Sequence, residues 1–83
     1  MTVMMYALST CAWCRRAKKF MQENNIEFDF VDVDLLPPEE RRQKKEELKT
    51  HNSAGSYPTI VINDGETVVV GFNADRLKEA FGL

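Results

Sequence analysis

The chain has 83 residues, a formal net charge of −2, and 43% hydrophobic and 29% charged residues. This length predicts one small domain, and the slight acidity argues against a nucleic-acid-binding protein, which usually carries a basic excess. No apolar run reaches the roughly 18 residues of a membrane span, and Met1 to Leu8 does not have the form of a signal sequence. We therefore expect a cytoplasmic protein that binds neither nucleic acid nor membrane. We also expect a monomer.

The first part of the chain predicts a strand, a helix and a second strand. Thr2 to Leu8 is a nearly continuous apolar run, as expected for a central strand that is buried on both faces. From about Ala12 to Asn24, apolar residues recur at helical spacing. Phe28 to Val33 alternates imperfectly and predicts the second strand. A strand–helix–strand unit of this kind predicts parallel strands joined by a right-handed crossover.

The middle of the chain predicts an exposed helix over residues 38–50. Two prolines can open it, and oppositely charged residues recur four positions apart. Leu48 is its only strongly apolar residue. We therefore expect its inner face to rely on alkyl stems and on the neighbouring Leu35 and Leu36.

The last third predicts a hairpin and a final helix. Thr59 to Ile62 is a β-branched run, and Asn63-Asp64-Gly65 is a turn signal that leads to a strand from Thr67 to Val70. Asn73 can cap a helix whose apolar face holds Leu77, Ala80 and Phe81. The expected fold is α/β, in the order βαβαββα, with a four-stranded mixed sheet flanked by three helices.

The stretch Thr10-Cys11-Ala12-Trp13-Cys14 lies where the first strand meets the first helix. With Cys11 as the N-cap, its sulfur faces amide N–H groups that have no partner within the helix, and these groups stabilise a thiolate. Cys11 is therefore the predicted nucleophile. Cys14 lies one turn further, where fewer donors are free, and is the predicted resolving thiol that closes a disulfide with Cys11.

The same cysteine spacing also occurs in zinc and iron–sulfur sites, and two cysteines can simply pack in a core. A metal site needs more ligands, and only His51 remains to join the pair. His51 is explained as well by a surface position at a helix end. Two chains could still share a cluster through Cys11, so a small iron–sulfur or metal carrier is the non-enzymatic alternative.

The chain resembles glutaredoxins and glutaredoxin-like redoxins over nearly its whole length. The resemblance lies in the order of the elements and in the segments TCAWC, SYPTIVI and GFNAD. The resemblance implies one glutaredoxin-like domain over residues 1–83 with the thioredoxin fold. It further implies that Pro58 follows a cis peptide bond and lies beside Cys11, leaving the Tyr57 backbone free to pair with an extended substrate such as glutathione or a peptide. The alternative is an ordinary proline at the start of a strand.

Four more residues are candidate substrate contacts. Trp13 is expected to be exposed and to cover the site, with core packing as the alternative. Thr59 offers its backbone or hydroxyl, although a strand threonine needs no function, and helix capping explains Asp75 as well as ligand binding does. The first helix carries four cations, Arg15, Arg16, Lys18 and Lys19. They could attract glutathione carboxylates or an acidic partner, or simply face solvent. Arg15 is the strongest candidate for a substrate contact among them.

Departures from the glutaredoxin pattern concern the electron source. Ala12-Trp13 stands where the family usually has Pro-Tyr, and Leu8-Ser9-Thr10 lacks the usual lysine, so one contact to a glutathione carboxylate is missing. The GF-x-x-D segment, Gly71 to Asp75, looks more like the redoxins that donate electrons to ribonucleotide reductase. We expect a thiol–disulfide oxidoreductase without a bound cofactor. It would act on disulfide-containing proteins and be reduced by glutathione, as a co-substrate, or by a thioredoxin-reductase-type flavoprotein.

Overall fold

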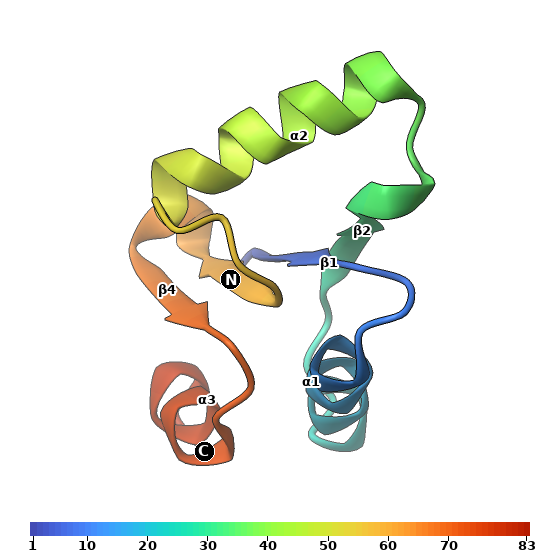
Figure 1. Cartoon of the computed structure of the whole chain (residues 1–83). Coiled ribbons are helices and arrows are strands. Elements are labelled where there is room, and N and C mark those ends of the chain that lie inside the picture. The colour runs from blue at the N-terminus through green and yellow to red at the C-terminus, as the bar shows by residue number, and fades with distance from the viewer.

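A computed structural model describes all 83 residues and contains four strands and three α-helices around one sheet (Figure 1). Short 3₁₀ turns, η1 (Val33–Leu35) and η2 (Asn63–Gly65), follow the second and third strands. The order βαβαββα expected from the sequence is confirmed, with these bounds: β1 (Val3–Ala7), α1 (Ala12–Glu23), β2 (Asp29–Asp32), α2 (Pro38–His51), β3 (Thr59–Ile62), β4 (Thr67–Val70) and α3 (Ala74–Phe81).

The sheet is mixed, with the strand order β2-β1-β3-β4. β1 runs parallel to β2 and antiparallel to β3, and β3 runs antiparallel to β4. The central strands β1 and β3 therefore have partners on both sides, which agrees with their continuous apolar sequences. The register pairs Ala7 with Asp32, so the ends of β1 and β2 lie side by side just before the cysteine segment.

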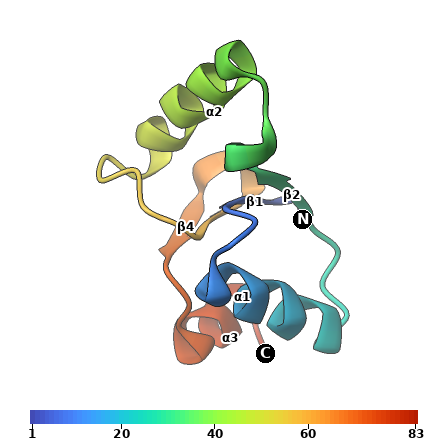
Figure 2. The ribbon, with the colours of Figure 1, turned by 45° about the vertical axis from the view of Figure 1, so that its right-hand side comes forward.

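The two faces of the sheet are covered unequally. Figures 1 and 2 show α1 and α3 on one face and α2 alone on the other. The main core lies under α1 and α3 and contains ten buried residues, among them Met5, Cys14, Met21, Ile60 and Leu77. The cluster under α2 on the opposite face is smaller, with three buried residues, Tyr6, Leu48 and Val61. This is the four-stranded, three-helix arrangement of the thioredoxin fold.

α2 is a charged helix held by one buried residue, Leu48, as the sequence indicated. The prediction that Leu35 packs against the inner face of α2 is wrong, because Leu35 is 69% exposed. The cause is the η1 turn, which buries Val33 and directs Leu35 to solvent, while Leu36 is half-buried. No helix in the structure combines enough length with enough apolar character to cross a membrane.

Candidate functional site

Cys11 is the N-cap of α1. The chain leaves β1 at Ala7, turns through three residues and enters the helix with Cys11 in an extended conformation, φ −87° and ψ 116°. The Cys11 sulfur accepts a hydrogen bond from the backbone N–H of Cys14 at 3.2 Å. Cys11 is half-buried at this position. The N-cap position that the sequence predicted for Cys11 is thus confirmed.

Cys14 is in a different environment from Cys11, although both are free thiols. Its side chain is fully buried in the main core. Burial raises the pKa of the Cys14 thiol to about 12, and the side-chain hydrogen bond with Cys11 acts in the same direction. Smaller opposing effects come from the Leu8 backbone and from the charge of Lys18. Cys14 is therefore protonated and shielded near neutral pH.

The turn before Cys11 is fixed by Ser9. The backbone N–H and the hydroxyl of Ser9 both donate to the carboxylate of Asp34, in η1. These two bonds lower the pKa of the Asp34 carboxyl. From the other side, the Arg15 guanidinium approaches the Ser9 carbonyl at 3.5 Å. The loop that presents Cys11 is thus attached to the end of β2 and to α1.

The peptide bond between Tyr57 and Pro58 is cis, as the family resemblance implied. Pro58 is buried, and its carbonyl accepts a hydrogen bond from the Gly71 N–H at 2.8 Å, which joins this loop to the GFNAD segment. Tyr57 and Cys11 both pack against the main core. Burial raises the pKa of the Tyr57 hydroxyl, and the nearby Asp34 and Cys14 act in the same direction. A direct contact between Pro58 and Cys11 stays a prediction.

Thr59 and Asp75 have contrasting positions. Thr59 is fully buried; its hydroxyl donates to the Ser56 carbonyl at 2.8 Å and accepts from the Asn52 amide at 3.0 Å. The Thr59 backbone also lies in the sheet, opposite Tyr6 on one side and Val70 on the other, so a contact between Thr59 and substrate stays a prediction. Asp75 is exposed in the first turn of α3, whose cap is Asn73, and no ion pair engages its carboxylate. Ligand binding by Asp75 stays a prediction.

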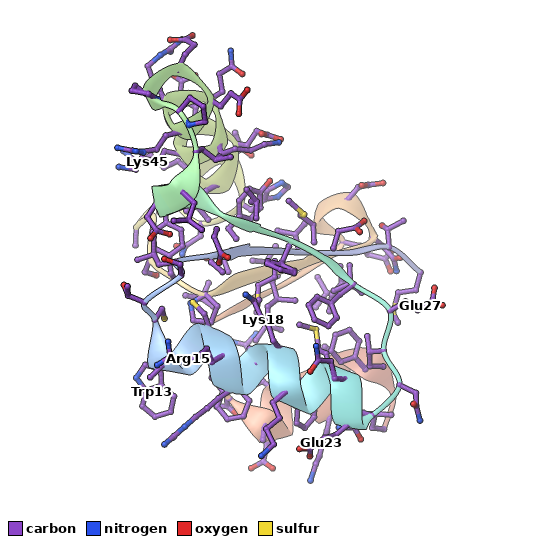
Figure 3. All side chains as sticks on the ribbon, turned by 90° about the vertical axis from the view of Figure 1, so that its right-hand side faces the viewer. Trp13, Arg15, Lys18, Glu23, Glu27 and Lys45 are labelled. Atoms are coloured by element: carbon purple, nitrogen blue, oxygen red, sulfur yellow. The ribbon has the colours of Figure 1, made fainter.

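Trp13 is 53% exposed and forms an aromatic surface next to the cysteines. Its ring stacks on Phe72 with 6.4 Å between the ring centroids, and the Arg16 guanidinium lies 4.7 Å from its centroid. Phe72 also meets Phe20 edge to face. Figure 3 shows Trp13 and Arg15 together at the N-terminal end of α1. The sequence indicated an exposed Trp13 but not its partner Phe72.

A hollow of about 280 Å³ lies on the Tyr57 side of the site, lined by Leu8, Val33, Asp34, Arg41, Lys45 and Tyr57. The Arg41 guanidinium donates to the carbonyls of Asp34 and Leu36 at 3.4 and 3.0 Å, and its Nε is buried without a partner. Lys45 has no ion pair. Neither cation was expected from the sequence, in which the only available signal is their spacing of four residues on one helix face. The structure contains no group of three or more His, Cys, Asp or Glu residues arranged to hold a metal.

Comparisons with known proteins place this site in context. A family model described as glutaredoxin matches residues 3–68, a range that includes Cys11, Cys14 and Pro58. The structure of methanoredoxin from Methanosarcina acetivorans is similar with a TM-score of 0.93 at 38% identity, covering 99% of this chain and 85% of that one.

Two curated relatives are similar in sequence. A glutaredoxin-like 8.6 kDa protein in the rubredoxin operon of Clostridium pasteurianum is 32% identical over 77 residues, 93% of this chain and 93% of that protein. The glutaredoxin-like protein NrdH of Salmonella typhimurium is 26% identical over 78 residues, 94% of this chain and 86% of that protein.

Proposed function

The chain belongs to the glutaredoxin family, and from that premise we propose that it is a thiol–disulfide oxidoreductase that reduces protein or glutathione mixed disulfides through Cys11 and Cys14. The observation that carries this proposal is the contrast between the two thiols. One is accessible at the start of a helix, and the other is buried and protonated one turn later. This contrast gives each cysteine its own step.

In the first step, the Cys11 thiolate attacks one sulfur of a substrate disulfide, the substrate S–S bond breaks, and the other sulfur leaves as a thiolate. In the second step, Cys14 loses its proton to solvent and attacks the Cys11 sulfur. The Cys11–substrate bond breaks, the remaining substrate sulfur leaves reduced, and the protein keeps a Cys11–Cys14 disulfide. Two electrons pass to the substrate, and an external thiol or flavoprotein must reopen the protein disulfide.

Glutathione is our first choice of electron donor. The sequence lacks a lysine before the cysteines, but Arg41 and Lys45 bring two cations to the hollow beside Tyr57. A cation pair of this kind suits the carboxylate of a glutathione-like tripeptide. The missing lysine therefore does not argue against glutathione as strongly as the sequence alone suggested.

A thioredoxin-reductase-type flavoprotein is the second candidate donor. It is supported by the exposed Trp13–Phe72 stack beside the cysteines, because aromatic side chains flanked by an arginine are typical of protein-binding surfaces. The GF-x-x-D segment points in the same direction, because it resembles that of the redoxins that donate electrons to ribonucleotide reductase.

The test is glutathione-coupled reduction of a small mixed disulfide, with a thioredoxin-reductase-coupled reaction run beside it. We expect Cys11→Ser to abolish activity in both. We expect Cys14→Ser to keep glutathione-coupled turnover, because glutathione can release the product from Cys11, and to lose the flavoprotein-coupled reaction. Activity in Cys11→Ser together with none in Cys14→Ser would contradict the assigned roles.

The non-enzymatic alternative, an iron–sulfur carrier that dimerises through Cys11, is separated by a simpler observation. Freshly purified protein with a cluster absorbs visible light, whereas a dithiol protein is colourless. We expect a colourless protein. A visible chromophore that disappears in Cys11→Ser would favour the carrier.

A further inference from the structure

Lys18 and Asp32 form a partly buried ion pair beneath the cysteine segment. The Lys18 ammonium lies 3.5 Å from the Asp32 Oδ1, and the two side chains are 21% and 19% exposed. The same ammonium lies 3.8 Å from the centroid of the Phe30 ring. The sequence placed Lys18 among the solvent-facing cations of α1, but its side chain turns toward the sheet (Figure 3). A pair this sheltered is screened less by solvent than a surface pair.

This pair is also close to the resolving thiol. Lys18 lies four residues after Cys14 on α1, which puts the two on the same helix face at roughly 5–6 Å between Cβ atoms. Asp32 ends β2 and pairs with Ala7, which directly precedes the cysteine loop. The Asp32 Oδ1 is buried and has no hydrogen-bond partner, and Lys18 is the cation with which it forms an ion pair.

The remaining titratable groups around Cys14 are few. They are Cys11 at the N-cap of α1 and Tyr57 in the loop before β3. Both favour the neutral Cys14 thiol, since a negative charge on either would repel a thiolate. Lys18 is the one cation among the influences on Cys14, and its charge favours deprotonation.

We propose that the Lys18–Asp32 pair controls how readily Cys14 becomes a thiolate, and thereby sets the rate at which Cys14 releases substrate from Cys11. In this role Lys18 places a positive charge near Cys14. Asp32 holds the Lys18 ammonium in position and partly offsets its charge. The proposal rests on the proposed function, because it concerns the second step of that reaction.

The experiment follows both steps in one reaction. Fully reduced protein is mixed with 4,4′-dithiodipyridine, a neutral disulfide whose thiopyridone product absorbs light. The first equivalent of product leaves when Cys11 attacks, and the second leaves when Cys14 closes on Cys11. The second phase is intramolecular, so its rate does not depend on reagent concentration, and its pH profile reports the deprotonation of Cys14.

We expect Lys18→Met to slow the second phase about tenfold near neutral pH and to shift its pH profile upward by about one unit, with a smaller effect on the first phase. We expect Asp32→Asn to accelerate the second phase, because Lys18 then acts without its opposing charge. Lys18→Arg should restore the rate. Lys19→Met is the matched control, since Lys19 pairs with Glu23 on the surface, where the two side chains are 77% and 62% exposed, and its loss should leave both phases unchanged.

The opposite signs separate an electrostatic role from a structural one. If the pair only joins α1 to β2, Lys18→Met and Asp32→Asn will change the second phase in the same direction and leave its pH profile in place, which overturns the inference. The inference is also overturned if the wild type releases two equivalents of thiopyridone and neither variant changes the rate of the second phase. If the wild type releases only one equivalent, the proposed dithiol function itself fails, and this inference fails with it.

Discussion

At the scale of single residues, the site depends on how its two cysteines differ. The two cysteines are three residues apart, yet Cys11 is only half-buried whereas Cys14 is fully buried in the core. The environment of the Cys11 thiol follows from its position at the start of the helix, and that of the Cys14 thiol follows from its packing against the sheet. Because a three-residue spacing on a helix produces both conditions at once, this local geometry supports the proposed order of the two chemical steps.

Ser9 offers a prediction at this scale. Its two hydrogen bonds lower the pKa of the Asp34 carboxyl below its ordinary value of 3.8. A carboxyl with a lowered pKa in the folded state stabilises the fold above the unfolded-state pKa, and this contribution is lost as the pH falls through the folded-state pKa. We expect Ser9→Ala to be less stable than the wild type at pH 7, with the difference shrinking as the pH falls below 3.8.

Urea unfolding of both proteins between pH 7 and pH 2.5 measures this difference. Thr10→Ala is a neighbouring control, because the exposed Thr10 side chain makes no hydrogen bond with Asp34. A constant gap between the wild type and Ser9→Ala at all pH values would show that the Ser9 bonds do not depend on the charge of Asp34.

Some residues of the site could be predicted from the sequence, and others could not. The N-cap position of Cys11 follows from a short turn between an apolar strand and a helical run, so local rules suffice. The direction taken by Lys18 does not follow, because a long side chain at the edge of a helix face can reach solvent or turn inward toward a charge on another strand. The hollow with Arg41 and Lys45 combines three separate parts of the chain, which no local pattern describes.

At the scale of elements, α2 is the least anchored part of the fold. Its exposed ion pairs, such as Arg42 with Glu46, contribute little because solvent screens them. Leu48 is its one buried residue and packs against Tyr6 and Val61 of the sheet, while Arg41 donates to backbone carbonyls before the helix. The sequence predicted this helix and its single apolar residue correctly, since charge pairs and a proline start are strong local signals. It failed for Leu35, whose direction depends on the η1 turn.

We therefore expect Leu48→Ala to destabilise the protein by about 2–5 kcal/mol, because it removes a fully buried side chain that has few neighbours to fill the space. Leu35→Ala is the matched control, with an expected change within about 0.5 kcal/mol, because Leu35 is mostly exposed. Urea unfolding measures both. Amide hydrogen exchange should also show that α2 opens more readily than β1 and β3 in the Leu48→Ala protein. Equal effects of the two substitutions would mean that α2 is held by contacts other than Leu48.

At the scale of the whole molecule, stability depends on pH through the buried thiol. The pKa of Cys14 is raised in the folded state from an ordinary value of 9.0 to about 12. A group with a raised folded-state pKa contributes its full stabilisation below the unfolded-state pKa and loses it as the pH rises toward the folded-state pKa. We expect the reduced protein to lose stability between about pH 9 and pH 12.

Reduced Cys14→Ala is the comparison, because it keeps both tyrosines and Cys11 but lacks this thiol. Guanidinium unfolding across this pH range should show a steeper loss for the reduced wild type than for the variant. Parallel curves would mean that the buried thiol does not titrate differently in the folded and unfolded states.

The position of Cys14 behind Cys11 also bears on how the protein survives peroxide. An accessible thiolate oxidises first to a sulfenic acid, and further oxidation to sulfinic or sulfonic acid is essentially permanent. Here a second thiol lies one helical turn away and is itself shielded by the core. It can condense with a sulfenic acid on Cys11, expel water and leave a disulfide that a reductant reopens. The burial that makes Cys14 slow to ionise therefore also keeps its thiol reduced while Cys11 is oxidised. We expect Cys11 to be returned to the thiol through the disulfide instead of being oxidised permanently.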